Sequence, residues 1–429
     1  PANYNITKII NATDSIMIAR GDLAIDIGHS EVPKVQLSLI KKCSQLSKSV
    51  IVATQMLESM IENNSATRAE INDIATAIFS REQLATSKRI FVDISDMRTK
   101  EFATGIQRVT KNILFNFLES GMDGYVLEPV YERSGKYYYA REYMLAWCGY
   151  TTDLITDDII APQNGDIFFG LDFCCVHVIN MQLLLRKWQE QGVKIMFVVY
   201  DLLPITKSNF FPITSSQYFT KWLEIITGVA DNLIGISQAT ANDLRQWLTH
   251  NNINTAAQIA AFHLGADIKV STAKRALSVA DSGIINKIKA TTSLLIVGTL
   301  EPRKAHAQVL ASLEQLWQEG IEVTLVIVGK QGWHVDKLVK RIQQHQQNAQ
   351  QLLWLDSIDD GMLEVIYKSA NLLLAPALAE GFGLPLIEAA QYKLPILARD
   401  IPVFREVAGE HASFFSGYQP EDLAQAIEC

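Results

Sequence analysis

The stretch Leu294-Leu-Ile-Val-Gly-Thr-Leu-Glu-Pro-Arg-Lys304 decides the fold class of this chain. Its first four residues are apolar and predict a buried strand, while Gly298 and Pro302 indicate a turn before a helix. A strand that runs through a glycine turn into a helix is the repeating unit of α/β folds. The turn would place the cations of Arg303 and Lys304 at a helix N-terminus, which suits a diphosphate; a solvated Arg-Lys pair is the alternative.

Short apolar runs alternate with helical patterns along the rest of the chain, which predicts parallel strands joined by helices. The predicted strands are Ser15–Arg20, Val50–Thr54, Ile90–Ile94, Ile167–Leu171, Ile195–Tyr200, Leu233–Ile236, Leu294–Val297, Leu325–Val328 and Leu372–Ala375. Apolar residues at helical spacing, such as Ile106, Val109, Ile113 and Phe117, predict the intervening helices. The fold class is therefore α/β.

Composition limits the classes of function. The 429 residues include 38 Lys and Arg against 46 Asp and Glu, a net charge of −8. This acidic balance argues against nucleic acid binding, which needs clustered cations. The five cysteines show no zinc-site spacing and favour a reducing cytoplasm, and no apolar run reaches the ~20 residues of a membrane span. We therefore expect a cytoplasmic protein that acts on small molecules.

A second stretch, Glu380-Gly-Phe-Gly-Leu-Pro-Leu-Ile-Glu388, follows the last predicted strand. Its glycines free the backbone and its proline suits a first helical turn, so the N–H groups near Gly383 and Leu384 should point out of a helix N-terminus. Glu388 falls about one turn into that helix, and Glu380 precedes it. Carboxylates accept paired hydrogen bonds from vicinal hydroxyls, so this pattern fits a sugar and a ribose joined by a diphosphate; chance surface glutamates are the alternative.

Two further positions in the middle of the chain are candidates for the same cleft. Gly105 stands at a strand-to-helix turn, where backbone N–H groups can approach an anion. Asp201 follows the predicted strand Ile195–Tyr200, and strand ends carry the chemistry of α/β folds. Each has an ordinary alternative, a tight turn for Gly105 and a helix cap for Asp201.

From about Arg89 to the end, the chain resembles the retaining glycosyltransferases of family 4. The matching segments are Thr-Gly-Ile-Gln-Arg-Val at 104–109, Val-Val-Tyr-Asp-Leu-Leu-Pro at 198–204, Phe-His-Leu-Gly-Ala-Asp-Ile at 262–268, Gly-Thr-Leu-Glu-Pro-Arg-Lys at 298–304, Val-Ile-Val-Gly-Lys-Gln-Gly-Trp at 326–333, the Glu380 to Glu388 stretch and Pro-Val-Phe-Arg-Glu-Val at 402–407. The resemblance implies two Rossmann-like domains that face each other across a cleft. It places an acceptor domain at 89–270, an interdomain linker at 271–288 and a nucleotide-sugar donor domain at 289–429, which we expect to be truncated.

The resemblance assigns a role to each candidate residue. It implies that Arg303 and Lys304 hold the donor diphosphate and stabilise the leaving nucleotide, that Glu380 contacts the donor sugar, and that Glu388 binds the ribose hydroxyls. The implied donor-binding set also includes Gly105, Gly298, Thr299, Gly383 and Leu384, and Asp201 would orient the acceptor or the sugar. No cofactor and no metal are expected in this part, because cations and a helix terminus neutralise the charge that develops on the diphosphate.

Three features depart from the pattern of that family. Tyr200 stands where many relatives have a histidine, so no catalytic histidine is expected there. Ala305-His306 replaces Asn-His after the cation pair, which removes one hydrogen-bonding side chain. Relatives commonly end with a helix that crosses back onto the first domain, and this chain stops short of it, so we expect weaker domain closure.

The first eighty residues carry a different pattern. Met-Ile-Ala-Arg-Gly-Asp-Leu at 17–23, Ala-Thr-Gln-Met-Leu-Glu-Ser-Met at 53–60 and Thr-Arg-Ala-Glu at 67–70 resemble the (β/α)8 barrel of pyruvate kinase over residues 4–79. The resemblance implies that Asp22 matches a ligand of the catalytic metal ion, with Gly21 at the phosphoenolpyruvate site and Thr54 nearby. A few β/α units cannot close a barrel or rebuild a two-carboxylate Mg²⁺ site, so we expect no kinase activity. We interpret residues 1–80 as a barrel fragment, followed by a linker at 81–88.

The sequence as a whole predicts a cytoplasmic retaining glycosyltransferase, in solution or at the inner face of the membrane. It would move a hexose, with mannose as our guess, from a nucleotide-diphosphate sugar to a glycan or lipid-linked acceptor in surface polysaccharide synthesis. The alternatives are a non-catalytic interaction or fusion protein, and a pyruvate kinase fragment that is inactive on its own. We interpret Cys174-Cys175 as core residues and His263 as structural.

Overall fold

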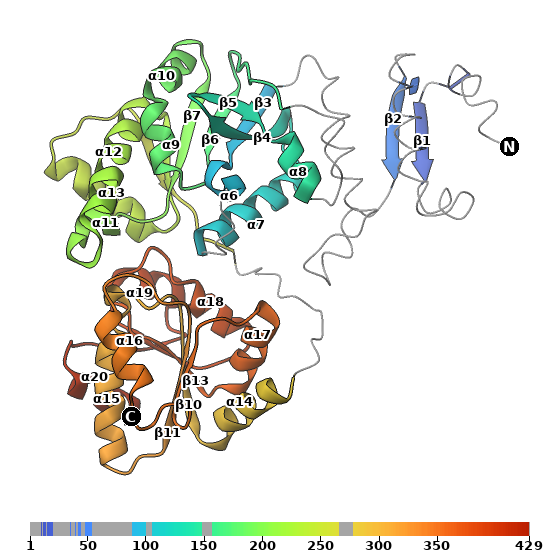
Figure 1. Ribbon diagram of the computed structural model, residues 1–429. Coiled ribbons are helices and arrows are strands. Elements are labelled where there is room, and N and C mark those ends of the chain that lie inside the picture. The colour runs from blue at the N-terminus through green and yellow to red at the C-terminus, as the bar shows by residue number, and fades with distance from the viewer. Residues whose placement is uncertain are drawn as a thin grey trace.

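The computed structural model describes residues 88–99, 105–147, 157–265 and 278–428 continuously, together with residues 10, 12–13, 15–19, 35, 39, 42–43 and 48–53. Within these residues the strands form one small and two large sheets (Figure 1). The small sheet pairs β1 (Ser15–Ala19) with β2 (Ser49–Ala53) in parallel, close to the positions that the sequence predicts.

The first large sheet has seven strands in the order β5-β4-β3-β6-β7-β8-β9. Its strands are β3 (Lys88–Asp93), β4 (Tyr125–Arg133), β5 (Lys136–Tyr139), β6 (Ile167–Gly170), β7 (Lys194–Val199), β8 (Asn232–Gly235) and β9 (Gln258–Ala261). All neighbouring pairs are parallel except β4 and β5. The carboxyl ends of six strands therefore lie along one edge of this sheet.

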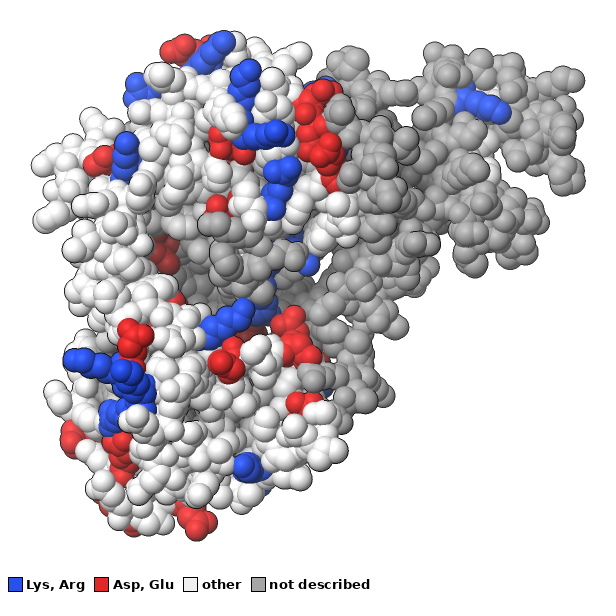
Figure 2. All heavy atoms as spheres, viewed as in Figure 1, with Lys and Arg blue, Asp and Glu red and all other residues white. Residues whose placement is uncertain are grey.

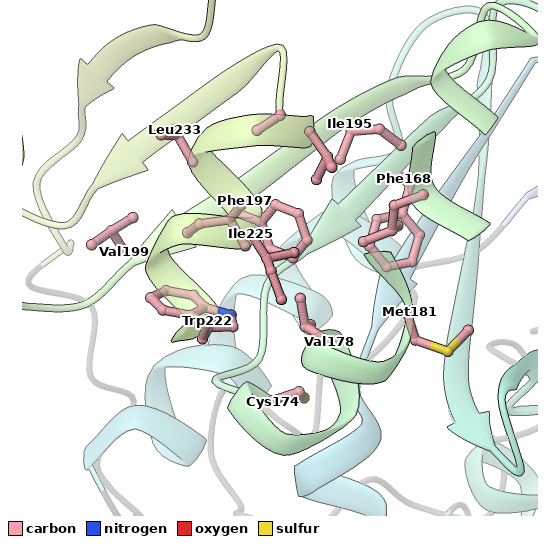
Figure 3. Packing of buried hydrophobic residues seen from close by; sticks show 14 of the residues in the cluster. Phe168, Cys174, Val178, Met181, Ile195, Phe197, Val199, Trp222, Ile225 and Leu233 are labelled. Carbon is pink, nitrogen blue, oxygen red and sulfur yellow. The ribbon is translucent and has the colours of Figure 1, made fainter. Parts of the chain in front are cut away.

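Helices pack on this sheet and complete the first unit. They are α6 (Ser95–Thr99), α7 (Gly105–Ser120), α8 (Arg141–Trp147), α9 (Cys175–Asn180), α10 (Gln182–Glu190), α11 (Leu203–Thr206), the 3-10 turn η3 (Ser208–Phe210), α12 (Ile213–Val229) and α13 (Gln238–His250). Figure 3 shows how Phe168 and Phe197 of the sheet and Trp222 of α12 point into one core. Cys174 is 1% exposed in the same core, which agrees with a packing role for this thiol.

The second large sheet has six strands, all parallel, in the order β12-β11-β10-β13-β14-β15. They are β10 (Thr292–Val297), β11 (Val323–Val328), β12 (Leu352–Leu355), β13 (Leu372–Ala375), β14 (Ile396–Arg399) and β15 (Ser413–Phe415). The helices are α14 (Val279–Ala290), the 3-10 turn η4 (Pro302–Lys304), α15 (His306–Gln318), α16 (Asp336–Gln343), α17 (Asp360–Ser369), α18 (Leu384–Gln391), α19 (Pro402–Ala408) and α20 (Pro420–Glu428). The chain thus has two Rossmann-like units, as the sequence predicts.

Helix α14 differs from the predicted layout. Most of this helix lies in the stretch 271–288, which the sequence analysis treats as an interdomain linker. Its first turn is fixed by a capping box, in which Ser278 accepts from the amide of Asp281 and the Asp281 side chain accepts from that of Ser278. Ile285 and Ile288 are buried against the second sheet. Ile284 packs against the same core, so a helix with a largely polar sequence is anchored by one apolar face.

The two units meet along the carboxyl edge of the first sheet (Figure 1). Phe382, in the segment before α18, is 4% exposed and belongs to the same hydrophobic cluster as Val198, Ile236 and Leu264 of the first unit. Trp333 donates its indole N–H to the carbonyl of Phe210 at 2.7 Å. Figure 2 shows the surface hollowed between the two lobes, where side chains of both charges gather.

Glu406 of α19 makes a second contact between the units. Its carboxylate accepts the backbone N–H groups of Gln238 and Ala239, at 2.5 and 2.7 Å, and lies 2.7 Å from Nε2 of His263. Gln238 is the first residue of α13, so a carboxylate of the second unit lies at the positive end of a helix in the first. The contact agrees with a structural role for His263. None of the described helices is long and apolar enough to cross a membrane.

Candidate functional site

The predicted cation pair and the first predicted glutamate lie together. Nη1 of Arg303 is 3.0 Å from Oε2 of Glu380, and Nζ of Lys304 pairs with the other oxygen of the same carboxylate. Nε of Arg303 is 2.7 Å from Oε2 of Glu301, a residue that the sequence analysis does not single out. All four side chains are at most 15% exposed. Two cations and two carboxylates therefore form one compact, partly dehydrated cluster.

The strand-to-turn segment after β10 explains how the cations reach this position. Gly298 has a φ of 142°, and a Cβ built on it would lie 3.3 Å from Nζ of Lys304. A side chain at position 298 would thus be strained and would crowd the ammonium group. Thr299 packs against the loop that contains Gly332. A Cβ built on Gly332 would lie 3.0 Å from the methyl group of Thr299. Gly298 therefore lies against Lys304, and Thr299 packs beside Gly332.

The charge states of the cluster follow from its pairing. Burial raises the pKa of a carboxyl group, yet Lys304 and Arg303 outweigh it at Glu380 and leave that pKa below its usual range. At Arg303, burial lowers the pKa, but the carboxylates of Glu380, Glu301 and Asp201 outweigh it and leave the pKa above its ordinary value. Glu380 is therefore ionised and Arg303 is charged at neutral pH.

The backbone after Glu380 is fixed on the first unit. The carbonyl of Gly381 accepts the hydroxyl of Ser237 at 2.9 Å and that of Thr240 at 3.3 Å. A Cβ on Gly381 would lie 2.4 Å from the carbonyl oxygen of Tyr200, a contact that real side chains do not make. Only glycine allows this approach, so the two units hold Glu380 at a defined place in the cleft.

Asp201 lies on the facing wall of the cleft. Its Oδ1 accepts the amide of Leu203 at 3.0 Å, and a Cβ on Gly381 would lie 3.1 Å from its Cβ. Burial raises the pKa of Asp201, and the charge of Arg303 opposes that rise. The local hydrogen bond is the cap-like contact that the sequence offers as an alternative, and the same carboxylate also lies beside the cation cluster.

The N-terminus of α18 lies opposite that of α7. Gly383 is the N-cap residue of α18 with a φ of 99°, and Leu384 is its first residue. A Cβ on Gly105, the first residue of α7, would lie 3.6 Å from Cδ1 of Leu384. Helix α7 begins at Gly105 itself, so its start lies close to the start of α18. Two positive helix ends thus face the same part of the cleft.

Glu388 receives one hydrogen bond at each carboxylate oxygen. Nη1 of Arg108 in α7 lies 3.1 Å from Oε1, and the hydroxyl of Tyr367 in α17 donates to Oε2 at 2.6 Å. Burial, and then the charge of Glu388, raise the pKa of Tyr367 well above its ordinary value, so this tyrosine stays a donor. Arg108 comes from the first unit and Glu388 from the second.

Several predicted site residues of the two large units come together: Arg303, Lys304 and Glu380 form one cluster, Asp201 lies beside it, and Gly105 lies close to Leu384. Gly21, Asp22 and Thr54 of the barrel fragment lie outside the described residues. The hydroxyl of Tyr200 donates to the carbonyl of Leu171 at 2.8 Å and lies 3.1 Å from Thr110, which ties it to its own unit.

Sequence reasoning misses several residues that hold the site together. They are Arg108, Ser237, Thr240, Glu301, Tyr367 and Phe382. Arg108 stands within the Thr-Gly-Ile-Gln-Arg-Val segment, so a charged residue in a matched motif is a signal that could have found it. Glu301 and Phe382 also stand within matched motifs, whereas Ser237, Thr240 and Tyr367 are common residue types without a spacing rule.

The fold and this site define a class of protein: two facing Rossmann-like units with a cation pair and two glutamates between them, the architecture of glycosyltransferases with the type B fold. Residues 281–429 match the family described as Glycosyl transferases group 1, and residues 2–83 match the pyruvate kinase barrel domain. The chain therefore carries a glycosyl transferase group 1 domain and, ahead of it, a pyruvate kinase barrel fragment.

Individual relatives match different shares of the chain. The chain is 35% identical over 382 residues to the serotype-specific mannosyltransferase WbdA of Escherichia coli, covering 88% of this chain and 47% of that protein. It spans about half the length of the WbdA proteins that it matches. Pyruvate kinase of Sporosarcina psychrophila is 56% identical over 75 residues, which are 18% of this chain and 13% of the kinase.

Solved structures with the same fold cover the two large units. The structure described as "Trehalose-6-phosphate from E. coli bound with UDP-2-fluoro glucose" has a TM-score of 0.53 and 14% identity, and the match covers 80% of this chain and 90% of that one. Anabaena Alr3699/HepE in complex with UDP-glucose has a TM-score of 0.52 and 14% identity, with 79% and 88% covered. At this identity the likeness defines the fold alone.

Proposed function

We propose that this chain is a retaining glycosyltransferase that moves a hexose from a nucleotide-diphosphate sugar to a glycan or lipid-linked acceptor in surface polysaccharide synthesis. The observation that carries the proposal is the cluster of Arg303, Lys304 and Glu380 beside the start of α18, with Glu388 one turn further on. The similarity to the mannosyltransferase WbdA supports this reaction and favours mannose as the sugar.

The chemistry follows from where charge develops. Cleavage of the bond between sugar and phosphate leaves negative charge on the diphosphate, and Arg303 and Lys304 would neutralise it. Both cations already share Glu380, whose carboxylate can also accept a hydrogen bond from a hydroxyl of the donor sugar. Glu388 would bind the ribose.

The floor and the facing wall of the cleft complete the donor site. Gly298 and Thr299 would line the floor, and backbone groups at Gly383, Leu384 and Gly105 would surround the phosphates at the two helix ends. From the opposite wall, Asp201 would orient the acceptor or the sugar.

We assign a separate function to each part of the chain. In this proposal residues 89–270 bind the acceptor and residues 289–429 bind the donor, whereas the segment 1–80 takes no part in transfer. A place at the inner membrane face would bring a lipid-linked acceptor within reach. A non-catalytic interaction protein is not favoured, because such a protein has no need of two half-buried cations that share one carboxylate.

The test is isothermal titration of the full chain with GDP, UDP, dTDP and ADP. We expect one of these nucleotides to bind, GDP if the sugar is mannose, and Glu388→Ala to weaken that binding by about tenfold or more. The same preparation is then given the corresponding hexose nucleotide and a mannosylated acceptor, with product formation measured directly. Binding of none of the four nucleotides would contradict the proposal.

A further inference from the structure

We infer that Arg108 is a positioning residue for the nucleotide: from the first unit it orients the Glu388 carboxylate of the second unit so that this carboxylate can bind the ribose. The inference rests on the proposed function and deepens it, because it makes recognition of the nucleoside depend on both units. It adds to the site a residue that touches Glu388 rather than the reacting atoms.

The first support is the geometry of the contact. Arg108 lies in the first turn of α7, which begins at Gly105, and its Nη1 is 3.1 Å from Oε1 of Glu388. The side chain of Glu388 is 6% exposed, whereas that of Arg108 is 34% exposed. A nearly buried carboxylate thus receives its cation from a side chain that lies at the cleft surface. A charge-assisted hydrogen bond of this kind is directional and holds the carboxylate in one rotamer.

The second support comes from the other carboxylate oxygen. The hydroxyl of Tyr367 donates to Oε2 at 2.6 Å, and the ring of Tyr367 stacks on that of Tyr392 with centroids 5.5 Å apart. Tyr367 is 2% exposed, so its hydroxyl cannot turn elsewhere without loss of packing. Arg108 and Tyr367 together hold Glu388 from two sides.

The pairing leaves acceptor positions on Glu388 for a diol. An ionised carboxylate has about four acceptor positions, and Arg108 and Tyr367 occupy one on each oxygen. One further position on each oxygen is left for the two vicinal hydroxyls of a ribose. A carboxylate held at both oxygens loses less rotational freedom when the ligand binds.

Glu388 and Arg108 belong to different units, which makes the orientation of Glu388 depend on how the units are placed. Glu388 belongs to the unit with the cation pair and Arg108 belongs to the unit with Asp201, so the oriented form of Glu388 exists only while the two units face each other as they do here. The alternative is that Arg108 only ties the units together, as Glu406 does with Gln238 and Ala239. The two roles differ in which part of the nucleotide they affect.

The experiment compares a nucleoside diphosphate with its 2′,3′-dideoxy analogue. The analogue keeps the base and the diphosphate but lacks both hydroxyls, so the ratio of the two dissociation constants reports ribose recognition alone. Titrations use the full chain and the nucleotide that it binds best among GDP, UDP, dTDP and ADP, with the ribo form taken for thymidine. We expect the unchanged protein to prefer the ribose form by about tenfold or more.

In Arg108→Ala we expect that preference to fall to about twofold or less, while the affinity for the dideoxy analogue stays within about twofold of the unchanged protein. Arg303→Ala is the matched control, since it should weaken both nucleotides equally and keep the ratio. Tyr367→Phe should lower the ratio as Arg108→Ala does. The melting temperature of each variant confirms that it is folded.

Each outcome decides between the roles. An equal loss for both nucleotides in Arg108→Ala would show that Arg108 only ties the units together, and would overturn the inference while leaving the proposed function intact. A preserved preference for the ribose form would overturn it as well. No nucleotide binding by the unchanged protein would overturn the proposed function and the inference together.

Discussion

Nη1 of Arg303 lies 3.0 Å from Oε2 of Glu380, so the cation expected at the donor diphosphate and the carboxylate expected at the donor sugar form one ion pair. The pair joins η4 to the segment before α18, two places 77 residues apart in the chain. Lys304 pairs with the other oxygen of Glu380. A ligand that brings negative charge to the two cations must therefore share them with this carboxylate.

The shared pairing predicts opposite effects of Glu380→Gln on binding and on transfer. Without the carboxylate charge, Arg303 and Lys304 are freer to bind phosphate, so we expect the affinity for the nucleoside diphosphate to rise severalfold. Transfer from the hexose nucleotide should fall by about 100-fold, because the charged contact near the reacting sugar is lost. Titration and initial rates on the same preparation check both. A parallel loss of affinity and rate would mean that Glu380 chiefly supports the fold of the site.

The close approach of Gly381 to Tyr200 predicts that Gly381→Ala abolishes transfer. The new methyl group would lie 2.4 Å from a backbone carbonyl, so the segment carrying Glu380 must move away from the first unit. We expect a loss of transfer of about 100-fold or more at nearly unchanged helix content. Gly283→Ala is the control, because a Cβ there meets nothing within 4 Å. A fully active Gly381→Ala protein would contradict the fixed position of this segment.

Much of the fold can be predicted from the sequence because buried parallel strands are short apolar runs. Each of the predicted strands has a counterpart, often shifted by a residue or two at its ends. Strand β4 is not among the predicted strands, because Glu128 and Pro129 interrupt its apolar pattern. Its pairing with β3 is nevertheless continuous. The pairing of the whole strand with its neighbour therefore outweighs the low strand propensity of these two residues.

The site also has a part that can be predicted from the sequence and a part that cannot. Arg303, Lys304, Glu380 and Glu388 stand in motifs whose spacing is fixed by a strand, a turn and a helix, and such spacing can be recognised in a sequence. Contacts between the two units have no such rule. Arg108 and Glu388 are 280 residues apart, and only the folded chain brings them together.

The backbone at Ala305 predicts a stabilising substitution. Ala305 has a φ of 55° and a ψ of 25°, a left-handed conformation that costs a residue with a Cβ about 1 kcal/mol. Ala305→Gly should raise the free energy of unfolding of the second unit by about 0.5–1 kcal/mol, measured by urea denaturation. Ala311→Gly, within the same helix α15, should lower it by about 1 kcal/mol. Destabilisation by both changes would show that the Ala305 turn carries no strain.

A buried acidic pair predicts how stability depends on pH. Burial raises the pKa of Asp93 and of Asp172 to about 6. Between the ordinary carboxyl pKa of about 4 and pH 6, the folded chain then binds more protons than the unfolded one, so the free energy of unfolding falls as the pH rises through this window. We expect Asp93→Asn to lessen the fall between pH 5 and 7.5 by about 1 kcal/mol. The exposed Asp123→Asn should leave it unchanged, and an equal pH dependence in all three proteins would refute the assignment.

The contact of Glu406 with α13 predicts that the alignment of the two units can be loosened without unfolding either. Its carboxylate accepts two amides at a helix start in the other unit, and a cap of this kind contributes about 1 kcal/mol. In Glu406→Ala we expect a larger radius of gyration by X-ray scattering and transfer reduced by about tenfold, because Arg108 and Glu388 then meet less often. Added nucleotide should restore the compact form, since it binds groups of both units. Glu410→Ala, an exposed glutamate just beyond α19, is the matched control, and an equally compact Glu406→Ala protein would mean that Phe382 and Trp333 suffice to hold the units together.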